Sequence, residues 1–309
     1  MRTFQSFDDF ITAKQPLLKQ GFEDCYLYLD GGNSALKWAI WQENKGRFAC
    51  YSLNWEQPDP QLAEQLVQAI HRRYRFLIIS SVRPDALERI QALLMETDEC
   101  LDTECVLALI LGHSIPNALP STAFPIANLY SDSQSLGIDR LMVAYGVQAQ
   151  ILEEGFLHQD EGTRSVAVLD IGSAVTMDVL RMHRTSERIT SYHGGVIAPG
   201  IDAIRWGMRH KTPRLPEADQ VSMLELDRAP TSTKQALLWG QDFFWLKGML
   251  GILKHYVELY AIDTVYLTGG GAQTFIHEAI AEAGYSCRVQ PSLQFEGMRS
   301  LLSRLIGEL

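Results

Sequence analysis

Leu29-Asp30-Gly31-Gly32-Asn33-Ser34 is the first of three glycine-rich stretches that each follow a run of apolar residues. The other two are Leu169-Asp170-Ile171-Gly172-Ser173-Ala174 and Leu267-Thr268-Gly269-Gly270-Gly271-Ala272. In each, a predicted strand ends at an Asp or a Thr, and glycines then turn the chain sharply. Glycine lets backbone N–H groups approach an anion, and a neighbouring Asp can hold a cation that the anion carries. Three such turns in 309 residues predict a protein that grips a polyphosphate from several sides.

The order of predicted elements around these stretches occurs twice. In each half a strand enters a glycine-rich turn, two more strands follow, and helices then alternate with strands. The two leading strands are predicted at 25–29 and 165–170. This is a duplication of architecture rather than a repeat of sequence, and it favours two α/β halves with a cleft between them. We therefore expect a first domain over 25–160 and a second over 161–309.

Residues 1–24 are expected to form an N-terminal extension. Phe4, Phe7, Phe10 and Ile11 have the spacing of one face of a short helix, which would pack on the body of the protein. The sequence indicates no function for this segment.

The composition limits the possible partners. The chain has 27 Lys and Arg against 37 Asp and Glu, which gives a net charge of −10 and a pI near 5.3. This charge argues against nucleic acid and anionic membranes as partners, so an anionic ligand must be held by local amides, a few basic side chains and metal ions. The five cysteines form no CxxC pair, no apolar run is long enough to span a bilayer, and no signal peptide is recognisable. These features predict a cytoplasmic protein.

The first glycine-rich turn has two interpretations. Asp30 and the residues after it can cradle phosphates, with Lys37 adding positive charge, or Gly32-Asn33 can satisfy the geometry of an ordinary hairpin. For this turn alone the hairpin is the better interpretation. The chain contains neither G-x-x-x-x-G-K-[ST] nor G-x-G-x-x-G, so it lacks a Walker A loop and a dinucleotide-binding fingerprint.

Gly137-Ile138-Asp139-Arg140 is predicted to open a helix. An acidic residue in a first helical turn is ordinary, because it interacts favourably with the helix dipole. In the functional interpretation, Asp139 accepts a proton from a substrate hydroxyl and Arg140 binds a substrate anion. For this motif alone the structural interpretation is again favoured. Residues 194–200 are likewise either a plain connection or a loop that presents a helix N-terminus to an anion.

Together, five segments resemble in order and spacing those of the type III pantothenate kinases, a branch of the acetate and sugar kinase, Hsp70 and actin superfamily. The resemblance covers about residues 25–309. It implies two actin-like, ribonuclease H-like α/β domains with a nucleotide cleft between them. It also implies ATP-dependent phosphorylation of pantothenate to 4′-phosphopantothenate, the first step of coenzyme A biosynthesis. The segments are Asp30-Gly31-Gly32-Asn33-Ser34 with Lys37, Gly137-Ile138-Asp139-Arg140, Asp170-Ile171-Gly172-Ser173-Ala174, 194–200, and Leu267-Thr268-Gly269-Gly270.

The resemblance also implies roles for single residues. Asp139 corresponds to the proton acceptor that faces the pantothenate hydroxyl, and Arg140 to the residue that meets its carboxylate. Asp30 is expected to face Mg²⁺ through water, and Asp170 to hold a monovalent cation, K⁺ or NH₄⁺. A homodimer is implied, with the site near its interface. The ATP-binding residues would be Asp30, Gly31, Gly32, Asn33, Ser34, Lys37, Ser173, Gly269 and Gly270, and the substrate-binding residues would be Tyr130, Gly137, Ile138, Asp139, Arg140 and, near that interface, Thr233.

Two departures and two alternatives accompany this resemblance. Ser173 stands where the family usually has Thr, and Gly271 where an Asp often follows the two glycines. One alternative is a non-catalytic regulatory protein on the same scaffold, a transcription accessory factor, which the intact set of Asp30, Asp139 and Asp170 opposes. The other is a kinase of the same superfamily for another small hydroxy acid.

Overall fold

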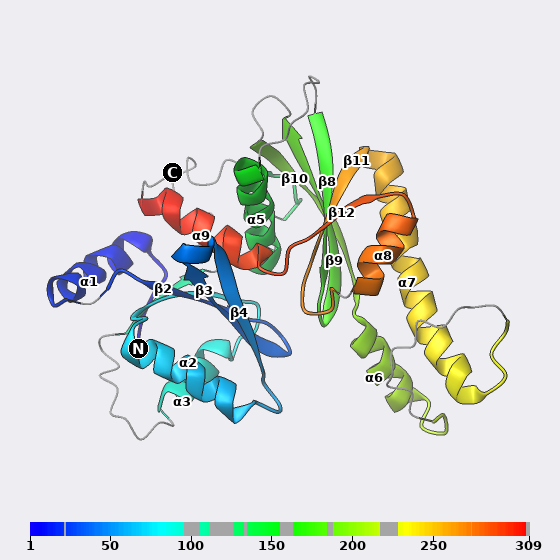
Figure 1. The fold of residues 1–309 in the computed structure, drawn as a ribbon, viewed down its shortest axis with the longest axis horizontal. Helices are drawn as coiled ribbons and strands as arrows, with labels where there is room; N and C mark the ends of the chain where they lie inside the picture. Colours follow the sequence, from blue (N-terminus) through cyan, green and yellow to red (C-terminus); the bar gives the residue numbers. More distant parts are fainter. Residues whose placement is uncertain are drawn as a thin grey trace. The chain divides into compact units, whose positions relative to one another are not determined.

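Figure 1 shows the fold of the protein as a computed structural model. The chain divides into two compact units, Met1–Glu154 with Ser292–Leu309, and Gly155–Pro291. This division differs from the predicted one in the last helix, which belongs to the first unit. The residues that the structure describes are 1–21, 23–95, 106–111, 126–132, 135–154, 163–183, 188–216, 228–272 and 274–306.

The first unit is built on a mixed sheet with helices on both faces. The strands of this sheet are β1 (Arg2–Phe4), β2 (Tyr26–Gly31), β3 (Ala35–Gln42), β4 (Arg47–Asn54), β5 (Phe76–Ser81) and β6 (Leu107–Leu111). The short β7 (Ala127–Asn128) is not part of it. The helices of this unit are α1 (Phe7–Lys19), α2 (Pro60–Arg72), α3 (Ala86–Met95), α5 (Ile138–Glu154) and α9 (Leu293–Ile306), with the 3₁₀ turn η1 (Glu43–Lys45). The order is β1-β6-β5-β2-β3-β4, in which β2, β3 and β4 form an antiparallel meander and the others run parallel to β2.

The pattern of β2 sets the two faces of this sheet. Side chains alternate along a strand, so Leu27 and Leu29 share one face. There they pack with Leu66 and Ile70 of α2 and with Ile90 of α3 in one buried cluster. Asp30 lies on the opposite face, at the carboxyl end of the strand.

Helices α5 and α9 lie side by side in the first unit (Figure 1). A Cβ atom on Gly146 of α5 would overlap the Leu293 carbonyl, and one on Gly297 of α9 would overlap the Met142 carbonyl. The two backbones are therefore in direct contact, which only glycine permits. This contact explains why the last helix joins the first unit.

The N-terminal segment is part of the first sheet. The expected helix is present as α1, and its Phe10 is fully buried, edge-on to both Phe4 and Phe76. The sequence did not predict β1, which pairs in parallel with β6 through Arg2–Phe4. Because β1 covers the outer edge of β6, that strand presents no open row of backbone groups along these three residues.

The second unit repeats the strand order of the first. Its strands are β8 (Thr163–Ile171), β9 (Ala174–His183), β10 (Arg188–Pro199), β11 (Ile262–Thr268) and β12 (Ser286–Val289), and its helices are α6 (Ile201–Lys211), α7 (Thr233–Tyr260) and α8 (Thr274–Glu282). Within this unit the order is β12-β11-β8-β9-β10, which corresponds strand for strand to β6-β5-β2-β3-β4. The meander is again antiparallel and the two further strands are again parallel to its first strand. The α/β class and the duplication into two ribonuclease H-like halves are thus confirmed.

Candidate active site

The first glycine-rich turn lies between β2 and β3. Asp30 is 4% exposed and lies directly opposite Lys37 on β3 and Ser80 on β5. Residues opposite one another on neighbouring strands share a face of the sheet, so the side chains of Lys37 and Asp30 lie on the same side. Gln294 of α9 reaches this face, where its Nε2 donates to Ser80 Oγ at 3.5 Å. The turn therefore offers one buried carboxylate beside one cationic side chain.

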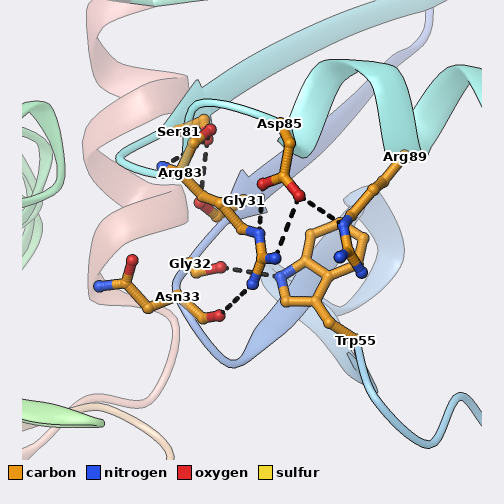
Figure 2. Close-up of polar contacts among 8 residues, drawn as sticks. All are labelled: Gly31, Gly32, Asn33, Trp55, Ser81, Arg83, Asp85 and Arg89. Carbon is orange, nitrogen blue, oxygen red and sulfur yellow. Dashed lines mark hydrogen bonds and ion pairs between the residues drawn. The ribbon is translucent and has the colours of Figure 1, made fainter.

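The backbone of this turn is held by side chains from outside it (Figure 2). Trp55 Nε1 donates to the Gly32 carbonyl at 2.8 Å, and Arg83 donates to the Asn33 carbonyl at 2.7 Å. Ser81 Oγ lies 3.0 Å from the Gly31 carbonyl. Sequence reasoning did not identify Trp55 or Arg83.

The motif at the start of α5 brings four of the predicted residues together. Asp139 is half-buried in the first helical turn, and its Oδ1 accepts the Arg140 N–H at 2.8 Å. A Cβ atom on Gly137 would overlap this same carboxylate oxygen, so glycine is what leaves room for it. Arg140 is 6% exposed and its guanidinium carbon lies 5.6 Å from the ring centre of Tyr130. The side chain of Ile138 is instead buried in the core.

The second and third glycine-rich turns converge in the second unit. β8 and β11 are parallel neighbours, with Asp170 opposite Thr268. Gly269 has a φ of +93°, and a Cβ atom there would overlap the Asp170 carboxylate. The Gly271 N–H donates to the Ile171 carbonyl at 2.8 Å, and the Gly200 N–H donates to the Ser173 carbonyl at 3.1 Å. Three loops that are far apart in sequence thus meet around Asp170.

Single carboxylates, rather than clusters, are what these loops offer to a metal ion. Among the described residues, no group of three or more His, Cys, Asp or Glu is arranged to hold a metal. Asp30 suits Mg²⁺ that takes its other oxygens from water and phosphates, as this ion commonly does. Asp170 could hold a cation through its carboxylate, which is in contact with Gly269 at a point where a Cβ atom would overlap it.

Thr233 belongs to the second unit. It is exposed in the first turn of α7, after the N-cap Ser232, whose hydroxyl accepts the Gln235 N–H. In the described part of the second unit, no hydrogen bond or ion pair joins Thr233 to Asp170 or Gly269. Its predicted role at a dimer interface stays a prediction.

A buried glutamate on the first unit lies outside every predicted site. Glu296 of α9 is 6% exposed, and burial together with the charge of Glu153 raises its pKa to about 7, against the opposing effects of Arg299 and Ser292. The Ser292 hydroxyl donates to Glu296 Oε1 at 3.3 Å. Its protonation therefore changes in the neutral range.

A family model described as type III pantothenate kinase matches residues 26–257. The chain belongs to the type III pantothenate kinase family. The match includes the first glycine-rich turn after β2, the motif at the start of α5, and the second glycine-rich turn between β8 and β9. The third turn after β11 lies outside it. None of the described helices has the length and apolar character needed to cross a bilayer.

Relatives of this family differ in how much of their length the chain matches. The type III pantothenate kinase of Phocaeicola vulgatus is 30% identical over 50% of this chain and 56% of its own length. That of Pseudomonas paraeruginosa is 28% identical over 88% of this chain and 96% of its own length. Among solved structures, component A of the Acidaminococcus fermentans (R)-2-hydroxyglutaryl-CoA dehydratase covers 92% of this chain at 13% identity, with a TM-score of 0.47.

Proposed function

We propose that this protein transfers the γ-phosphoryl group of ATP to the primary hydroxyl of pantothenate, which gives 4′-phosphopantothenate and ADP and opens the synthesis of coenzyme A. The observation that carries the proposal is the Gly137–Asp139–Arg140–Tyr130 arrangement at the start of α5, in a chain of this family. The two alternatives from the sequence, a regulatory protein and a kinase for another hydroxy acid, have no such specific support.

In this proposal Asp139 accepts the proton of the attacking hydroxyl. Its carboxylate is oriented by the Arg140 N–H and lies in the space that Gly137 leaves. Arg140 and Tyr130 would bind the pantothenate carboxylate and chain, and Thr233 would complete the site across a homodimer interface. A guanidinium that already lies against an aromatic ring has few alternative positions, so it is suited to fix one end of a small substrate.

The phosphates of ATP would be bound by the glycine-rich turns. The residues proposed to bind them are Asp30, Gly31, Gly32, Asn33, Ser34, Lys37, Ser173, Gly269 and Gly270. Phosphoryl transfer requires little covalent chemistry from the protein, so positioning and charge neutralisation account for most of the catalysis. Mg²⁺ at Asp30 and a monovalent cation at Asp170 would neutralise phosphate charge when bound.

The proposal is tested by measuring ADP release with a panel of acceptors. Pantothenate should support ADP release, and acetate, sugars and simple hydroxy acids should not. ADP release with another hydroxy acid in place of pantothenate would favour the second alternative. Tight, salt-sensitive binding to DNA without any ADP release would favour the regulatory one. Cytoplasmic location remains a prediction of the sequence.

A further inference from the structure

The carbonyl groups of the first glycine-rich turn are held one after another. The Gly31 carbonyl lies 3.0 Å from Ser81 Oγ, and the Gly32 carbonyl accepts the Trp55 indole N–H at 2.8 Å. The Asn33 carbonyl accepts from Arg83 at 2.7 Å, and the Ser34 carbonyl accepts the Trp55 backbone N–H at 3.1 Å. The carbonyls of Gly32, Asn33 and Ser34 therefore accept from donors outside the turn, and the Ser81 hydroxyl lies within reach of both the Gly31 and the Arg83 carbonyls.

Holding these carbonyls also fixes the direction of the amides between them. A trans peptide is planar, so the N–H of each residue points opposite to the carbonyl of the residue before it. No cis peptide occurs among the described residues. The amides of Asn33 and Ser34 must then point away from Trp55 and Arg83. Figure 2 shows the Asn33 side chain on that far side as well, directed away from the guanidinium.

Arg83 is itself held in place. Its Nε and Nη2 both bind the Asp85 carboxylate, the second at 3.1 Å, and Arg89 binds the same carboxylate at 2.7 Å. These guanidinium groups hold the pKa of Asp85 well below its usual range, so the pair stays charged at any neutral pH. The guanidinium carbons of Arg83 and Arg89 lie 5.7 and 5.6 Å from the Trp55 ring centre. The fork of Arg83 is thus already used by Asp85 and Asn33.

We infer that Trp55 and Arg83, with Asp85 behind them, are positioning residues that aim the Asn33 and Ser34 amides at the nucleotide phosphates. Their effect on a bound nucleotide goes through the backbone of the turn rather than through contact. This inference rests on the part of the proposed function that assigns phosphate binding to this turn. It adds the residues that set the geometry of the turn.

The sharpest variant is Trp55→Phe, which keeps the ring and removes the one indole donor to Gly32. The matched control is Trp41→Phe, because the Trp41 indole N–H donates to no described acceptor although Arg299 also lies over its ring, at 3.8 Å. The measurement is the calorimetric Kd of ADP and of adenosine, without pantothenate. For Trp55→Phe we expect the ADP Kd to rise about threefold to tenfold, the loss typical of one hydrogen bond, with adenosine and the control unchanged.

A second pair of variants separates position from charge. Arg83→Lys keeps the positive charge but cannot bind Asp85 and Asn33 with one planar fork, so its ADP Kd should rise about tenfold. The control is Arg73→Lys, since Arg73 makes a similar pair with Glu23 at 2.8 Å on an exposed part of the same unit. Wild-type ADP affinity in both Arg83→Lys and Trp55→Phe would overturn the inference. So would an equal loss of ADP and adenosine binding.

Failure of the inference and failure of the proposed function give different results, because the first is measured by ADP binding and the second by ADP formation from ATP. If the wild-type protein binds ADP but forms no ADP from ATP in the presence of pantothenate, the proposed function is wrong. The comparison of ADP Kd values between variants remains valid in that case. A wild-type protein that binds ADP no better than adenosine overturns the inference, whatever its activity.

Discussion

Two of the three aspartates assigned to the site, Asp139 and Asp170, have carboxylates that lie where a glycine lacks a side chain. A Cβ atom at Gly137 would displace the Asp139 carboxylate, and one at Gly269 would displace that of Asp170. At Gly31, just after Asp30, a Cβ would lie 2.7 Å from Ser81 Oγ and from Ala86 Cβ. Glycine here sets where charged oxygens lie, in addition to letting the chain turn.

Asp139→Asn tests the residue on which the chemistry depends. The amide keeps the shape and can still lie beside the Arg140 N–H, but it cannot accept the hydroxyl proton. We expect kcat to fall about 10²–10⁴-fold with the Kd values of ATP and pantothenate retained. Steady-state kinetics and calorimetry measure the two quantities. The control is Asp8→Asn, because Asp8 is exposed and holds the same second position in its helix, α1. Near wild-type turnover in Asp139→Asn would remove it as the base.

Single residues differ in how far the sequence predicts them. Asp30, Asp139 and Asp170 could be proposed as site residues because each lies near glycines in the chain. Trp55 and Arg83 could not, because they contact the first turn across 23 and 50 residues of sequence. A side chain that donates a hydrogen bond to a backbone carbonyl far away in the sequence carries no local sequence pattern by which it could be recognised.

Among the elements, α9 depends on close backbone packing against α5. The sequence analysis placed its residues in the second domain, 161–309, whereas the structure has them in the first unit. Periodicity gives the buried face of a helix and not its partner. The edge strand β1 was missed for a related reason, since three residues carry too little pattern to identify a strand.

Gly297→Ala and Gly248→Ala should have opposite effects on the free energy of unfolding. A Cβ at Gly297 would overlap the Met142 carbonyl, so we expect a loss of about 1–3 kcal/mol from overpacking. A Cβ at Gly248 of α7 would meet no neighbouring atom within 4 Å, so alanine should raise the free energy by up to about 1 kcal/mol through helix propensity. Denaturant unfolding measures both. A stabilising Gly297→Ala would refute the α5–α9 contact.

Glu296→Gln should change how stability depends on pH. The pKa of Glu296 is about 7 in the folded protein against an ordinary value of 4.5, so the folded state binds its proton more tightly. Stability from this group is complete below pH 4.5 and is lost as the pH rises through 7. The Gln variant should therefore match wild type near pH 4.5 and exceed it at pH 8 by ~1–3 kcal/mol. Exposed Glu282→Gln is the control, and a constant difference across this range would contradict the account.

At the scale of the whole molecule, the residues proposed to act are divided between two units of one strand order. The first holds Asp30, Asp139 and Arg140, and the second holds Asp170 with its converging loops. The repeated order of predicted elements was enough to foresee this duplication. Which loops meet within a unit required the structure, because parallel pairing of β8 with β11 joins residues about a hundred positions apart.

Asp170→Asn tests whether the second unit contributes to the reaction through a monovalent cation. With the carboxylate charge removed, the K⁺ concentration needed for half-maximal activity should rise, and the KM for ATP should rise at low K⁺. The KM for pantothenate should stay near wild type. Asp263→Asn on the same sheet is the control, since Asp263 is paired with Arg164 at 3.3 Å. Activity that is independent of K⁺ in the wild-type protein would contradict the cation site.

The central claim is that this one chain moves a phosphoryl group from ATP to pantothenate. Its most direct test follows the phosphorus atoms by ³¹P NMR in a mixture of the protein, ATP, Mg²⁺, K⁺ and pantothenate. The account predicts that a phosphomonoester of pantothenate and ADP appear in equal amounts, and that neither appears without pantothenate. Unchanged ATP, or orthophosphate released at the same rate with and without pantothenate, would contradict it.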